Sequence, residues 1–174
     1  MFPIIDKGPF GLVLRTLLWS IAGFTVWLLG ASWYENLLGD IAWQFSPRED
    51  VFLYLKNHVF SIGLTEPGRS SLPQLTFNSH NLGFGFIVTG AIILGSRQRS
   101  WSSRIMGLVA SWFLLLITHI CMLVLAAQTY SLAMAKPDSI LPFSIFVKSV
   151  HPTITLVPII ITIVWLITSL QKTR

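Results

Sequence analysis

The chain has 174 residues, of which 53% are hydrophobic and only 11% are charged, and its mean hydropathy is +0.69. Soluble domains carry about 25% charged residues, so this chain has too few charges to cover a surface that faces water. Its length fits one domain over residues 1–174, and lipid is expected to surround much of it. The single cysteine, Cys121, excludes an intrachain disulfide.

Four apolar stretches follow one another along the chain, and a membrane-spanning helix needs about 20 apolar residues. The stretches predict spans at about residues 10–33, 77–95, 105–127 and 153–170. The first is longer than the core of a signal peptide and has no cleavage site after it, so we expect it to be retained. The sequence therefore predicts an all-α membrane protein, a bundle of four transmembrane helices.

The basic residues predict the direction of these spans. The N-terminus, the loop at 96–104 and the C-terminus hold one acid, Asp6, against seven basic residues, which are Lys7, Arg15, Arg97, Arg99, Arg104, Lys172 and Arg174. By the positive-inside rule, these segments are cytoplasmic. We therefore expect external loops at 34–76 and 128–152, both termini in the cytoplasm, and a bacterial inner membrane as the location.

The first external loop has the features of a short helix. Residues 46–49 read Ser-Pro-Arg-Glu, with a capping serine, a proline at the first helical position and a glutamate three residues after the serine. Residues 51–55 are too apolar for free exposure, which predicts an amphipathic helix lying on the membrane surface or on the bundle. Residues 75–77 are expected to be extended.

Several polar residues fall in the outer half of the predicted bundle, where ionisable groups are costly and therefore candidates for function. Interfacial placement or interhelical hydrogen bonding is the structural alternative. Two histidines from different spans could ligate a haem iron, whereas a metal site would lack a supporting carboxylate in the spans. A cysteine paired with a histidine could be a peptidase nucleophile, although burial in an apolar span makes a thiol inert. These candidates are Asn78, Ser79, His80, His119, Cys121 and His151.

The second predicted span contains four glycines, Gly83, Gly85, Gly90 and Gly95. Small residues at such spacings let helices approach closely. Two uses remain open, which are packing inside the bundle and docking of a helix from a partner protein.

The order of these stretches resembles the exosortase/archaeosortase superfamily of membrane protein-sorting transpeptidases. Those enzymes use a Cys at the outer start of one helix, an Arg in the next helix after a short basic loop, and a His at the outer start of the helix after that. The corresponding stretches here are 77–83, 97–101, 118–122 and 150–152. Only His151 matches in type, since Ser79 or His80 stands near the place of the nucleophile and Cys121 near that of the arginine. Without the Cys and the Arg, a member of this family should be inactive.

The chain is also similar to the exosortase-H-associated membrane proteins. The opening stretch 12–19, and Asn78 followed by Gly83-Phe84-Gly85 at the second span, carry this resemblance. It implies an accessory protein beside an exosortase in the inner membrane, which helps to process proteins with a C-terminal sorting signal.

The sequence thus predicts a non-catalytic accessory or scaffold protein of an exosortase-type sorting system. Its expected partners are membrane lipid and another multi-span protein, with no cofactor. The sequence has no nucleotide-binding loop and no basic patch of the size of a nucleic-acid site, so no nucleic-acid partner is expected. Two alternatives remain, a small haem- or chlorophyll-binding subunit of a respiratory or photosynthetic complex and a divergent membrane cysteine peptidase.

Overall fold

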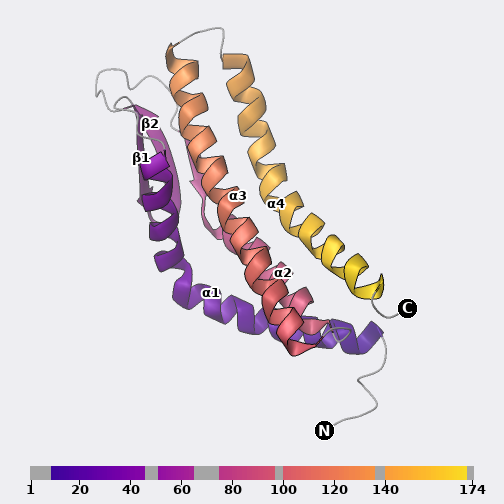
Figure 1. Cartoon of the computed structure of the whole chain (residues 1–174). Helices are drawn as coiled ribbons and strands as arrows, with labels where there is room; N and C mark the ends of the chain where they lie inside the picture. Colours follow the sequence, from indigo (N-terminus) through magenta and orange to yellow (C-terminus); the bar gives the residue numbers. More distant parts are fainter. Residues whose placement is uncertain (1–8, 46–50, 65–74, 97–99, 136–139, 172–174) are drawn as a thin grey trace. The chain divides into compact units, whose positions relative to one another are not determined.

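The computed structural model describes residues 9–45, 51–64, 75–96, 100–135 and 140–171, and these residues are mostly helical (Figure 1). Within them lie four helices and three strands. The helices are α1 (Pro9–Phe45), α2 (His80–Gly95), α3 (Trp101–Ala135) and α4 (Ile140–Gln171). The strands are β1 (Val51–Lys56), β2 (Val59–Leu64) and β3 (Leu75–Asn78), which follow α1 and precede α2.

Three of the helices are long and apolar enough to cross a membrane, over Phe10–Phe45, Trp101–Ala133 and Lys148–Thr168. The 37 residues of α1 amount to about 55 Å of helix measured along its axis at 1.5 Å per residue, more than a hydrocarbon core of about 30 Å requires. The 16 residues of α2 extend for only about 24 Å. The number of helices agrees with the prediction, but only three of the four are long enough to be transmembrane helices, because α2 is shorter than the predicted span at 77–95. The helices α1 and α3 continue past the predicted span ends at 33 and 127, and α4 begins before the predicted start at 153.

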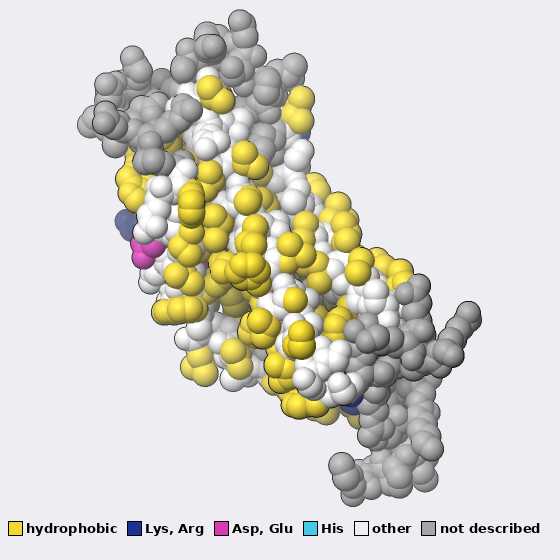
Figure 2. Space-filling view, viewed as in Figure 1, with side chains coloured by type: hydrophobic (Ala, Val, Ile, Leu, Met, Phe, Trp, Pro, Cys, Tyr) yellow, Lys and Arg dark blue, Asp and Glu magenta, His cyan; other side chains and the backbone are white. Residues whose placement is uncertain are grey.

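The surfaces of the long helices are apolar, and hydrophobic side chains cover much of the face shown in Figure 2. On α1, Leu29 is 85% exposed, and on α3, Met106 is 72% exposed. Contiguous apolar surface of this kind is rare on soluble proteins. The exposed side chains therefore indicate a membrane protein whose helices face lipid.

Contacts divide the chain into two compact units. Unit 1 comprises Met1–Gly30, Gly83–Leu115 and Thr155–Arg174, and unit 2 comprises Ala31–Leu82 and Leu116–Ile154. In unit 1, the buried ring of Phe86 on α2 lies between two indoles, stacked on Trp27 at 6.0 Å and edge-on to Trp112 at 5.8 Å. Thus α2 packs directly against α1 and α3 in this unit.

The core of unit 2 lies between a small sheet and the helices. The strands form an antiparallel sheet in the order β1-β2-β3, with Tyr54 opposite Ser61 and Ser61 opposite Thr76. Figure 1 shows β1 and β2 beside the C-terminal part of α1. The fully buried ring of Phe60 packs with Leu38 and Ala42 of α1. A second cluster joins the sheet to α3, through Val51, Ile62, Ala126, Ala127 and Tyr130.

The predicted amphipathic helix in the first external loop is wrong, and with it the all-α class. Residues 51–64 form a β-hairpin, β1 and β2, joined by Asn57 and His58. Both turn residues have positive φ, of 49° and 61°, as a two-residue hairpin turn of type I′ requires. The predicted helix start at 46–49 lies outside the described residues. The extended conformation predicted for 75–77 is confirmed by β3.

The hairpin forms because its residues suit a strand better than a helix. Valine and phenylalanine occur in both strands, with tyrosine in β1 and isoleucine in β2, and these residues favour a pleated surface packed on one side. More buried and exposed side chains alternate along β3 and along residues 53–56 of β1, which matches the period of a strand.

Candidate functional site

A buried carboxylate connects three parts of unit 2. Glu35 on α1 is 2% exposed and Ser79, before α2, is fully buried. The Ser79 hydroxyl lies 2.5 Å from Glu35 Oε1, and His58 Nδ1 lies 2.8 Å from Glu35 Oε2. The carboxylate therefore holds the hairpin turn and the start of α2 against α1.

The backbone brings Ser79 and His58 together independently of Glu35. The Ser79 N–H donates to the His58 carbonyl oxygen at 2.9 Å, and the Ser79 hydroxyl lies 2.8 Å from the same oxygen. Because a hydroxyl has one proton, it donates to this carbonyl or to Glu35 at any moment. We name Glu35, His58 and Ser79 the carboxylate cluster.

The carboxylate cluster contains the residue types of a serine hydrolase but not their order. In a catalytic triad the histidine lies between the serine and the acid, and takes the proton of the serine. Here the acid lies between the serine and the histidine. Ser79 is also inaccessible, with 0% exposure, whereas the His58 side chain is 43% exposed. This geometry suits a structural clamp and gives no route for nucleophilic attack.

His119 on α3 forms the second polar contact of unit 2. It is 2% exposed, and its Nδ1 lies 2.7 Å from the hydroxyl of Tyr34 on α1. The two rings meet nearly edge-on at 6.2 Å. A hydrogen bond between these side chains satisfies both polar groups in an apolar setting and links α1 to α3.

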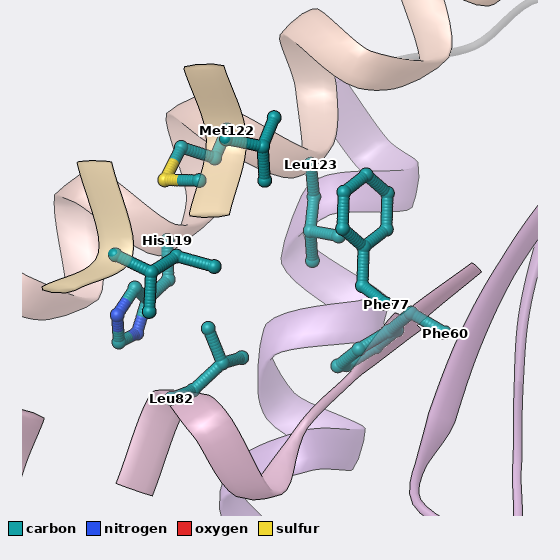
Figure 3. Close-up of a pocket in the computed structure, with 8 residues that line it drawn as sticks. Phe60, Phe77, Leu82, His119, Met122 and Leu123 are labelled. Atoms are coloured by element: carbon teal, nitrogen blue, oxygen red, sulfur yellow. The ribbon is translucent and has the colours of Figure 1, made fainter. Parts of the chain in front are cut away.

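A small pocket lies beside His119 (Figure 3). Its volume is about 20 Å³, enough for roughly one water molecule. Apart from His119 its lining is apolar and comes from α2, α3, α4 and the sheet, with Phe60, Phe77, Leu82, Met122, Leu123, Val150 and Ile154.

A haem does not fit this pocket. His119 and Met122 both line it, and cytochromes use this pair of residue types as axial ligands. A porphyrin is many times larger than the water-sized cavity, and Nδ1 of His119 already contacts Tyr34. Across the described residues, no three His, Cys, Asp or Glu side chains gather as a metal site would need.

Cys121 lies away from His119. The two residues are two positions apart on α3, so their side chains point about 200° apart around the helix axis. His119 is buried whereas Cys121 is exposed. A nucleophile needs its base within hydrogen-bond reach, so Cys121 and His119 do not form such a pair. The side chains of His80 and His151 are outside the described residues, so a pair of Cys121 with either of them stays a prediction.

The candidate polar residues that the structure describes lie in different surroundings and do not gather into the site expected from the sequence. Ser79 belongs to the carboxylate cluster, and Asn78 lies exposed at the end of β3. His80 begins α2 and His151 lies within α4, but their side chains are outside the described residues. The resemblance to a sorting enzyme at His151 therefore stays a prediction.

Sequence reasoning missed the partners of these residues, which are Tyr34, Glu35 and His58. Glu35 falls in the predicted external loop at 34–76, since the first span was expected to end near residue 33. The sequence nonetheless contains a pattern that indicates the burial of Glu35. Glu35 is followed at positions three and seven by Leu38 and Ala42, so it lies on the face of α1 that is buried.

The glycines of α2 face side chains of the same chain. A Cβ on Gly83 would overlap the Trp27 ring, and one on Gly85 would lie 2.7 Å from Pro158. For Gly90 the nearest atom would be Leu108 Cδ1 at 3.3 Å, and for Gly95 the Thr16 hydroxyl at 2.9 Å. In unit 1 these glycines therefore let α2 pack closely against α1, α3 and α4.

A comparison with protein families, curated proteins and solved structures finds no match to this chain.

Proposed function

We propose that the chain is a non-catalytic scaffold protein of the membrane, and that it serves an exosortase-type protein-sorting system. The observation that carries the non-catalytic part is the carboxylate cluster. Its buried acid and serine are engaged in holding the sheet to α1, and the serine is inaccessible. A buried acid and serine arranged in this way stabilise a fold rather than act on a substrate.

The assignment to a sorting system is supported by the resemblance in the opening stretch and around Asn78, Gly83 and Gly85. The sheet supports this assignment because it has two edge strands, β1 and β3, to which a sorting signal could bind. Edge strands can bind an extended peptide as an additional strand. A C-terminal sorting signal in extended form is a suitable ligand, and the sheet would present it to the sorting enzyme.

Purification from the native host tests the partner. A tagged copy in mild detergent should retain a multi-span membrane protein with an intact Cys, Arg and His set. Recovery of a redox or pigment complex, or of the chain alone, would contradict the proposal. An absorption spectrum of the same sample should have no Soret or chlorin band.

Site-specific cross-linking tests the role of the sheet. In a Cys121→Ala background, single cysteines are introduced by Tyr54→Cys on β1 and Thr76→Cys on β3, both exposed positions. The matched control is Ser102→Cys, an exposed position in unit 1. Disulfide cross-links to a sorting-signal peptide should form at position 54 or 76 and not at 102. Equal labelling at all three positions would remove the peptide-binding role.

A further inference from the structure

Two arginines meet at the C-terminal end of α2 in unit 1. Arg15 Nε, from α1, donates to the Gly95 carbonyl oxygen at 3.1 Å. An Nη of Arg104, from α3, donates to the Leu94 carbonyl oxygen at 3.2 Å. These carbonyls belong to the last turn of α2, where no intrahelical N–H is available. Both guanidinium groups therefore bind the last turn of α2.

The positive charges of Arg15 and Arg104 exceed the partial negative charge of the C-terminus of α2. The C-terminus of a helix is equivalent to about half a negative charge, against two full positive charges. Unit 1 as a whole contains seven basic residues and a single acid, Asp6. Unit 1 therefore has a net positive charge, which favours the binding of anions.

The surroundings of the two arginines are those of a membrane interface. Trp101 is 53% exposed, lies 6.0 Å from Trp19, and has the Arg104 guanidinium over its ring at 5.7 Å. Tryptophan prefers the headgroup level of a bilayer. Farther along α3, Ile105 and Val109 are 42% and 62% exposed and offer an apolar track.

We propose that this end of unit 1 binds the headgroup phosphate of an anionic phospholipid. Arg15 and Arg104 supply the charged contacts, since a guanidinium has five donors and suits a phosphate. Trp101 lies at the level of the lipid glycerol, and the acyl chains lie along Ile105 and Val109. Basic pockets between membrane helices bind anionic headgroups in this way. The inference does not depend on the proposed function.

Lipid binding to the purified full chain tests this site. In a neutral detergent, native mass spectrometry and thermal unfolding compare phosphatidylglycerol with phosphatidylcholine of the same acyl chains. The wild-type chain should prefer phosphatidylglycerol and unfold at a higher temperature with it. The double variant Arg15→Gln/Arg104→Gln should lose about tenfold in affinity or more. The control Lys56→Gln/Lys148→Gln, at exposed positions of unit 2, should bind as the wild type does.

Equal binding of the two lipids by the wild-type chain would overturn the proposal, as would wild-type affinity in the arginine double variant. Inorganic phosphate should give no thermal shift, and a full shift with phosphate alone would exclude the lipid as the source of the anion. If the double variant does not fold, Arg15→Lys/Arg104→Lys keeps the charge at this end. It should retain the preference for phosphatidylglycerol, and loss of that preference in a folded lysine variant would place the binding elsewhere.

Discussion

The Glu35 carboxylate is buried, and its hydrogen-bond partners determine whether unit 2 can tolerate it. Transferring a charged group from water into the protein interior costs several kcal/mol of free energy unless hydrogen bonds compensate for the lost water. Ser79 and His58 supply those bonds from two different segments. This arrangement explains why a short hairpin with an unusual turn, Asn57-His58 at positive φ, is held in one position.

The loss of Ser79 should therefore be costly. We expect Ser79→Ala to lower the free energy of unfolding by about 1.5–3 kcal/mol, the value of a hydrogen bond to a charged group. The exposed Ser102→Ala should change it by less than about 0.5 kcal/mol. Denaturant unfolding of the purified protein in detergent measures both. Equal stability of the two variants would show that the cluster does not hold the fold.

Thr89 on α2, unlike Ser79, has a fully buried hydroxyl without a hydrogen-bond partner among the described residues. A buried polar group without a partner destabilises a fold. Thr89→Val keeps the shape of the side chain and should raise the free energy of unfolding by about 1 kcal/mol. A decrease in the same unfolding measurement would mean that the hydroxyl has a partner in the membrane.

Among the elements, α2 is the one whose sequence is most restricted by its neighbours. It is too short to cross a bilayer upright, and in unit 1 it is packed by the three other helices through its glycines. Its last carbonyls are satisfied by arginines of α1 and α3. The stability of α2 therefore comes from close packing rather than from helix propensity, since glycine is a poor helix former.

A pair of glycine substitutions tests this packing. Gly83→Ala should lower the melting temperature, with a cost of about 1–3 kcal/mol, because the new Cβ meets the Trp27 ring. Gly30→Ala in α1 is the matched control, since no atom lies within 4 Å of its Cβ position. The control should stabilise the helix by about 0.5–1 kcal/mol. Two effects of the same sign would contradict the packing assigned to α2.

For the whole molecule, the membrane character, the four helices and the extended segment at 75–77 could be predicted from the sequence, because they depend on composition and local pattern. The hairpin was missed since Asn57-His58 is not a glycine-containing turn, and the apolar run of β1 fits a helix as well as a strand. The contacts of Glu35 with Ser79 and of Tyr34 with His119 span 44 and 85 residues. Spacing along the chain cannot reveal contacts of that range.

The division into two units separates the charges in the same way as the sequence does. Unit 1 holds the seven basic residues assigned to the cytoplasmic side, and the six acids other than Asp6 belong to unit 2. The direction of the chain across the membrane stays a prediction. Accessibility of Ser102→Cys to a membrane-impermeant thiol reagent, in a Cys121→Ala background, should require permeabilised cells. Labelling in intact cells would reverse the direction.

The most direct test of a scaffold role measures folded protein and function in the same host cells. The variants are Ser79→Ala, Glu35→Gln and His119→Phe, with Cys121→Ala as an exposed control. Processing of proteins with a C-terminal sorting signal should fall only in proportion to the amount of folded protein, and Cys121→Ala should have no effect. Processing that is abolished in a variant with wild-type amounts of folded protein would contradict a non-catalytic scaffold and assign that residue to a reaction.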